Sequence, residues 1–233
     1  AVAVVKAGAF AIIRLTYFSY GTYLLKGTWA QYVVMATALI TILIGSTMAL
    51  KTSHIKRRLA YSTISNLSYI LFSVSLMTQE GLSSGLLHMV YHAVIKITLF
   101  FCTGAILVQT GRQYVKEIEG IGMKMPIIFG CFTICGFGLV GVPPFAGFHS
   151  KWNIAVSAVR AHNPLAYAGI YVLIISALLT ALYIFTILIA AYFPKPEAIA
   201  ERDDSNVKDP GPLMTVTIIS LTITSVILGF FPT

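Results

Sequence analysis

Long apolar segments separated by short polar loops constrain this chain more than any other feature. Residues 29–50, for example, contain no Asp, Glu, Lys or Arg. A helix needs about 20 apolar residues to cross the ~30 Å hydrocarbon core of a bilayer. Backbone polar groups in lipid must also be satisfied within the segment, which favours helices over irregular structure. The pattern therefore predicts an all-α integral membrane protein.

About seven transmembrane helices are predicted, and together they form a single domain. The predicted spans are 1–25, 29–50, 56–79, 82–109, 125–160, 165–193 and 212–231. The span 125–160 is too long for one straight crossing, because a continuous helix of that length would reach about 54 Å. It also contains a break of two glycines and two prolines: Gly141, Pro143, Pro144 and Gly147. We therefore expect this helix to be discontinuous.

The composition argues against a soluble protein, a nucleic-acid partner and a metal site. The chain of 233 residues is only 10% charged, whereas soluble domains carry about 25% charged residues. Its net charge of +8 comes largely from loops between apolar spans, which does not indicate nucleic-acid binding. Cys102, Cys131 and Cys135 lie inside spans without a zinc-binding spacing, so we expect them to be packing residues. Without a P-loop or a Rossmann fingerprint either, we expect no cofactor in this chain.

Basic residues are distributed unequally between two sets of loops. With seven crossings, the loops 51–58, 110–124 and 194–211 share one side of the membrane. They carry ten basic residues: Lys51, Lys56, Arg57, Arg58, Arg112, Lys116, Lys124, Lys195, Arg202 and Lys208. The loops on the other side carry two, Lys26 and Arg160. The positive-inside rule then places the more basic side in the cytoplasm.

Four cations interrupt the apolar spans, although all eight acidic residues lie in loops or at helix ends. These cations are Lys6, Arg14, Lys96 and Lys151. A lysine at the centre of a membrane helix costs ~2.5–3.5 kcal/mol even on the lenient insertion scale. Arg14 is nearer a helix end and is expected to be structural, whereas the lysines need a functional reason.

His88, His92 and Lys96 are spaced by four residues. Each step advances ~6 Å and turns only ~40°, so the three form one stripe on a helix face. Histidine titrates near neutral pH, and burial disfavours the charged form of a lysine. The stripe therefore predicts a water-bridged proton relay. The alternative is interhelical hydrogen bonding by the histidines, with Lys96 extending outward; a metal site lacks supporting carboxylate or thiolate ligands.

The predicted helix 56–79 is polar on one face, at Ser62, Ser65, Asn66, Tyr69 and Ser73. This face suits either a hydrated cavity or packing through hydrogen bonds, and the sequence favours neither. Lys56, at the start of the helix, is either an ordinary topology charge or a residue that feeds protons into the bundle.

Five segments in order resemble a known family: VVKAGAFAIIR (4–14), HIKRRLAYSTISNLSYIL (54–71), LLHMVYHAVIKITLFF (86–101), GVPPFAGFHSKW (141–152) and ALLTALYIF (177–185). They are similar to antiporter-like membrane subunits of respiratory complex I, of Mrp-type sodium/proton antiporters and of energy-converting membrane-bound hydrogenases. That fold has about fourteen helices with inverted repeats. The resemblance implies that this chain starts in the eighth helix and is the C-terminal part of a longer polypeptide.

The resemblance also implies roles for individual residues in a membrane-embedded proton pathway. Lys6 corresponds to the lysine of the family's eighth helix, Lys56 to that of the tenth, Lys96 to that of the eleventh beside His88 and His92, and Lys151 to the charged residue of the broken twelfth. Three departures stand out. The family's glutamate–lysine pair would precede Ala1, Thr186 stands where an arginine is frequent, and the chain ends at Thr233 without a lateral helix.

The function implied is that of a proton-translocating subunit of a redox-driven complex I-like or membrane-bound hydrogenase complex in a prokaryotic cytoplasmic (inner) membrane. Its partners would be other membrane subunits, including antiporter-like homologues, a peripheral Fe–S redox arm in partner chains, and the lipid bilayer. The alternatives are an Mrp-type Na⁺/H⁺ antiporter subunit and a non-conducting membrane scaffold fragment.

Overall fold

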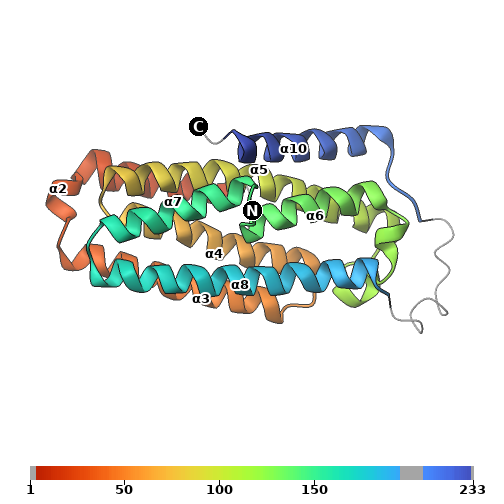
Figure 1. Cartoon of the computed structure of the whole chain (residues 1–233), viewed down its shortest axis with the longest axis horizontal. Helices are drawn as coiled ribbons and strands as arrows, with labels where there is room; N and C mark the ends of the chain where they lie inside the picture. The colour runs from red at the N-terminus through yellow and green to blue at the C-terminus, as the bar shows by residue number, and fades with distance from the viewer. Residues whose placement is uncertain (1–3, 195–206, 232–233) are drawn as a thin grey trace.

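The regular structure is helical throughout the described part of the chain, as the apolar segments predict. The computed structural model describes residues 4–194 and 207–231, and outside helices these contain one isolated β-bridge. The elements in order are α1 (Val4–Arg14), η1 (Leu15–Tyr20), α2 (Thr22–Leu25), α3 (Trp29–Lys51), α4 (Ile55–Ser75), α5 (Gln79–Thr110), η2 (Val115–Ile118), η3 (Ile121–Met123), α6 (Pro126–Val140), α7 (Ala146–Arg160), α8 (Pro164–Tyr192) and α10 (Pro212–Phe230). The longer helices run side by side along the long axis (Figure 1).

Four of the described helices are long and apolar enough to cross a membrane: α3, α5, α8 and α10. Helix α4 is also 21 residues long but carries many serines, and most of its residues are buried inside the bundle. Its polar side chains are therefore shielded from lipid by the neighbouring helices α3, α5 and α8.

The described parts of the loops predicted to share one side, 51–58, 110–124 and 207–211, meet at one end of the bundle, on the right in Figure 1. The Ile55 N–H donates to the Gln113 carbonyl at 3.0 Å, and the Gly120 N–H donates to the Ala190 carbonyl at 3.1 Å. Asp209 accepts hydrogen bonds from the N–H groups of Ile127 and Ile128, at 3.3 and 3.2 Å. Its carboxylate thereby caps the positive end of α6. Lys195 and Arg202 lie outside the described residues.

The predicted break in 125–160 separates two half-length helices, α6 and α7, which confirms a discontinuous helix. Gly141 ends α6 with a φ of 93°, in the left-handed region that glycine tolerates. Pro143 and Pro144 follow, and α7 begins at Ala146. A Cβ atom at Gly147 would overlap the carbonyl oxygen of Gly138, so the first turn of α7 lies directly on the end of α6.

Replacing Gly147 with alanine should destabilise the protein by about 2–3 kcal/mol, because the added methyl group forces the two half-helices apart. Gly130→Ala on α6 is the matched control, since a Cβ there meets nothing within 4 Å. That control should be neutral or slightly stabilising, given alanine's higher helix propensity. The thermal unfolding midpoint of the detergent-solubilised protein measures both. Equal unfolding midpoints for Gly147→Ala and Gly130→Ala would contradict the close contact of α6 and α7 at the break.

Candidate functional site

The predicted stripe of His88, His92 and Lys96 lies inside the bundle on the buried face of α5. Their exposed fractions are 2%, 1% and 0%. The two imidazole rings stack with centroids 5.8 Å apart and an interplanar angle of 10°. Lys96 therefore does not extend outward to the membrane surface, and that part of the alternative is wrong. The other part, interhelical hydrogen bonding by the histidines, holds for His88, which is hydrogen-bonded to Ser150 of α7.

Lys96 is held by oxygen atoms of α4. Its Nζ donates to the Leu59 carbonyl at 2.9 Å and also to the Ser62 hydroxyl. The Ser62 hydroxyl itself donates to the same carbonyl, at 2.9 Å. The four acidic residues in the described part of the chain, Glu80, Glu117, Glu119 and Asp209, lie in loops or at helix ends. Neutral oxygens, rather than a carboxylate, therefore bind this fully buried amine.

Lys151 occupies the break between α6 and α7. Its Nζ donates to the carbonyls of Leu139 and Val140, at 2.7 and 2.9 Å. The last carbonyls of a helix lack intrahelical partners, and they form the negative end of the helix dipole. The break thus creates the acceptors that hold the amine, and the same Nζ lies 5.5 Å from the ring centroid of Tyr69.

Tyr69 and Ser150 connect Lys151 to the histidine stripe. The Tyr69 and His88 ring centroids are 5.6 Å apart, so Tyr69 contacts both His88 and Lys151. The Nδ1 atom of His88 is hydrogen-bonded to the Ser150 hydroxyl at 2.9 Å. Because Ser150 and Lys151 are adjacent on α7, the break brings both against the centre of α5.

A small cavity lies where these groups meet. Its volume is about 10 Å³, and it is lined by Asn66, His88, His92, Ile95, Gly138, Leu139, Gly147, Ser150 and Lys151. That volume is about the minimum that holds one water molecule.

Several polar atoms of this cavity lining are buried and lack a hydrogen-bond partner among the described residues. They are His88 Nε2, both ring nitrogens of His92, and Asn66 Oδ1. Buried polar atoms are nearly always hydrogen-bonded in proteins, to ordered water where protein groups are missing. The site therefore combines titratable groups with bonding capacity for water, which is what proton transfer between them requires.

The other two predicted relay lysines lie in different surroundings. Lys6 is 9% exposed in α1. Lys56 is half-buried at the start of α4, one turn before Leu59, at the end of the bundle that holds the basic loops.

The polar face of α4 combines the two alternatives that the sequence left open. Ser62 and Asn66 face the lysine–histidine cluster, which consists of His88, His92, Lys96 and Lys151. Ser65 and Ser73 instead donate to the backbone carbonyls of Ser62 and Gly81, at 3.1 and 2.6 Å. One part of the face thus lines the site and the other part serves packing.

Arg58 is a buried cation that the sequence interpretation counted only as a topology charge. It is 6% exposed. Its guanidinium donates to the Thr52 carbonyl at 2.9 Å, the Tyr183 carbonyl at 3.0 Å and the Thr186 hydroxyl at 2.6 Å. Arg58 precedes Ser62 by four residues, and this spacing could have predicted that both lie on the same buried face of α4. Arg58 joins α4 to α8 through Thr186, the position at which the resemblance noted above would lead one to expect an arginine.

Comparisons with known proteins agree with this architecture. The sequence family described as "NADH:quinone oxidoreductase/Mrp antiporter, TM" matches residues 1–180. NADH-quinone oxidoreductase subunit N of Desulforudis audaxviator is 34% identical over 239 residues, covering 97% of this chain and 46% of that protein. The chain thus spans less than half the length of that relative.

Two solved structures are similar over nearly the whole chain. A chain of the archaeal membrane-bound sulfane sulfur reductase, a respiratory membrane complex, is 28% identical with a TM-score of 0.83, covering 98% of this chain and 44% of that one. A chain of the Mrp complex from Dietzia sp. is 22% identical with a TM-score of 0.83, covering 96% and 48%. The latter likeness shows the fold alone.

Proposed function

Because the chain belongs to the NADH:quinone oxidoreductase/Mrp antiporter transmembrane family, we propose that it translocates protons as part of an antiporter-like membrane subunit. The subunit would work in a redox-driven complex I-like or membrane-bound hydrogenase complex. Relatives named as subunits of NADH-quinone oxidoreductase and of F(420)H(2) dehydrogenase support this proposal.

The observation that carries the proposal is the cluster of Lys96, His92, His88 and Lys151, of which the two histidines and Lys151 line a small cavity. Ionisable groups inside a membrane are expensive and are functional by default. Neutral oxygens hold both lysines, so either amine loses or gains a proton without leaving a carboxylate unpaired. Like charges also disfavour each other, so protonation of one lysine promotes proton release from another.

In this proposal, protons move between Lys6, Lys96 and Lys151 through water and the two histidines, and Lys56 supplies protons from the cytoplasm. Electron transfer occurs in partner chains that carry Fe–S centres, and this chain itself holds no cofactor. Other membrane subunits, including antiporter-like homologues, flank it in a prokaryotic cytoplasmic (inner) membrane. The loops 51–58, 110–124 and 194–211 face the cytoplasm, in accord with their excess of basic residues.

Transport by sealed vesicles that contain the intact complex tests the proposal. Addition of an electron donor should drive proton transport that does not depend on sodium, and co-purifying subunits should include Fe–S proteins. Sodium-dependent proton exchange without any electron donor would instead assign the chain to an Mrp-type antiporter.

A further inference from the structure

A polar seam between α5 and α7 extends from the lysine–histidine cluster to the surface. On α5 the four-residue spacing continues backwards from His88 through Ser84 to Glu80. Each step is ~6 Å along the helix. The seam therefore reaches the end of the bundle opposite the basic loops, on the left in Figure 1.

An open cavity of about 400 Å³ lies at this end of the seam. Its lining includes Glu80 and Ser84 from α5, and Asn153, Ser157 and Arg160 from α7. The outer residues are exposed, whereas Ser84 and Ser157 at the inner end are only 5% and 2% exposed. The cavity therefore ends one helical turn from the buried His88.

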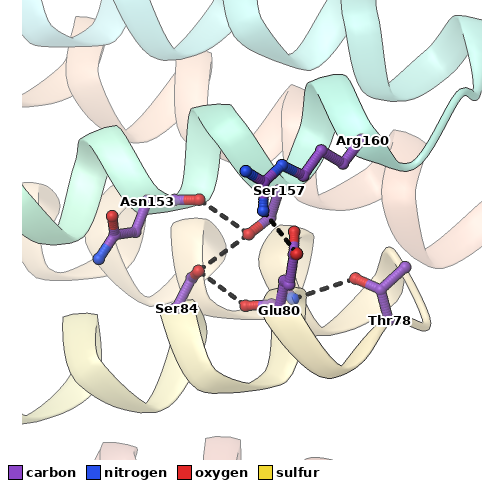
Figure 2. A network of polar contacts seen from close by, with 7 residues as sticks. Thr78, Glu80, Ser84, Asn153, Ser157 and Arg160 are labelled. Carbon is purple, nitrogen blue, oxygen red and sulfur yellow. Dashed lines mark hydrogen bonds and ion pairs between the residues drawn. The ribbon is translucent and has the colours of Figure 1, made fainter.

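A network of polar contacts crosses the cavity (Figure 2). The hydroxyl oxygens of Ser84 and Ser157 lie 2.9 Å apart, and each also lies within hydrogen-bond distance of a carbonyl of its own helix, Glu80 at 2.7 Å and Asn153 at 2.8 Å. The two hydroxyls have one proton each, so these three contacts share two protons. Above them, Arg160 forms an ion pair with Glu80 at 2.6 Å. The pair joins the first turn of α5 to the last residue of α7.

A purely structural role explains this ion pair poorly. The Arg160 and Glu80 side chains are 64% and 49% exposed, and exposed ion pairs stabilise proteins by only ~0–1 kcal/mol. The position of the pair is more informative, because it lies over an open cavity whose inner end, at Ser84, is one helical turn from His88.

We propose that this cavity is the mouth through which the relay exchanges protons with the side of the membrane opposite the basic loops. Glu80 is the outermost proton acceptor, and Arg160 closes the mouth by pairing with it. A proton that leaves the His88 ring passes through water beside Ser84 and Ser157 and neutralises the Glu80 carboxylate. The neutral acid releases Arg160, and loss of the proton to bulk water restores the pair. This inference rests on the proposed function.

Thiol accessibility tests the mouth without relying on pumping. Ser84→Cys and Ser157→Cys are made in the intact complex in sealed vesicles, with Ser176→Cys as the control. Ser176 is fully buried but lies between α3 and α8, where it is hydrogen-bonded to Ser46. A small membrane-impermeant thiol reagent is added to either side, and the unsubstituted complex gives the background from the buried native cysteines.

Ser84→Cys should react about tenfold faster than Ser176→Cys, and only from the side opposite the basic loops, because thiol labelling follows solvent access. Adding Arg160→Gln should raise the rate further by opening the mouth. Reaction no faster than at Ser176→Cys, or from the basic side, would overturn the inference whether or not the complex pumps.

Glu80→Gln tests the acceptor itself. It should lower donor-driven proton transport several-fold while electron transfer continues, whereas the control Glu119→Gln, at the opposite end of the bundle, should leave transport unchanged. Unchanged transport in Glu80→Gln would exclude Glu80 as the acceptor. Full transport after removal of Lys96 and Lys151 would instead reject the proposed function, and the labelling pattern distinguishes the two failures.

Discussion

Replacing Lys96 with alanine is expected to abolish donor-driven proton pumping by the complex while the subunits still assemble. The amine lies at the inner end of the stripe of His88, His92 and Lys96 and is fully buried. Its removal interrupts the path between Lys6 and the histidines. We expect the pumping rate to fall to about a tenth of wild type or below, which corresponds to a barrier raised by ~1.4 kcal/mol or more. Proton uptake by sealed vesicles, measured beside the rate of electron transfer, gives the result.

A second substitution separates proton transfer from packing at the same position. Lys96→Ala leaves a cavity in the bundle, and cavities destabilise proteins. Lys96→Met fills a similar volume without a titratable group, so we expect it to restore stability but not pumping. Lys51→Ala is the control, because Lys51 is an exposed lysine at the end of α3. Wild-type pumping by both Lys96 variants would support the non-conducting scaffold.

The positions of the stripe and of the break could be predicted from the sequence, because both depend on local geometry. A four-residue spacing places His88, His92 and Lys96 on one helix face whatever surrounds them. Glycines and prolines in series end a helix whatever follows. The burial of the stripe could also be predicted, because exposing three polar side chains to lipid would cost much free energy.

The partners of these groups could not be predicted, because they come from distant segments. The backbone carbonyl of Leu59 binds Lys96 across 37 residues, and a backbone acceptor leaves no signature in the sequence. Ser150 beside His88 and Tyr69 beside Lys151 depend on how α7 crosses the bundle. Arg58 was misinterpreted for a related reason, because a cation near a helix start is usually a solvent-exposed topology charge.

Lys96 and Lys151 are bound in the same way, because no carboxylate lies deep in the described part of the bundle. Each is bound by helix-backbone oxygens, at Leu59 for Lys96 and at the end of α6 for Lys151. A carbonyl oxygen accepts from a charged or a neutral amine alike. A carboxylate partner would favour the charged form and hold the proton. Backbone acceptors therefore suit lysines that must both take up and release protons.

Replacing Lys151 should affect both stability and transport, and the choice of substitution separates the two. Lys151→Ala leaves the Leu139 and Val140 carbonyls without their charged donor, so we expect a loss of about 2 kcal/mol in stability together with the loss of pumping. Lys151→Arg keeps donors and charge for the same carbonyls. We therefore expect its thermal unfolding midpoint to stay near wild type.

Pumping should nevertheless be lost in Lys151→Arg, to about a tenth of wild type or less, because a guanidinium stays protonated in proteins. A lysine that acted only as a cap on α6 would be replaced by arginine without loss of transport. The comparison of unfolding midpoints and donor-driven proton uptake for the two variants therefore decides between a cap and a proton-exchanging group. A Lys151→Arg complex that pumps at the wild-type rate would remove Lys151 from the relay and leave it as a structural residue of the helix break.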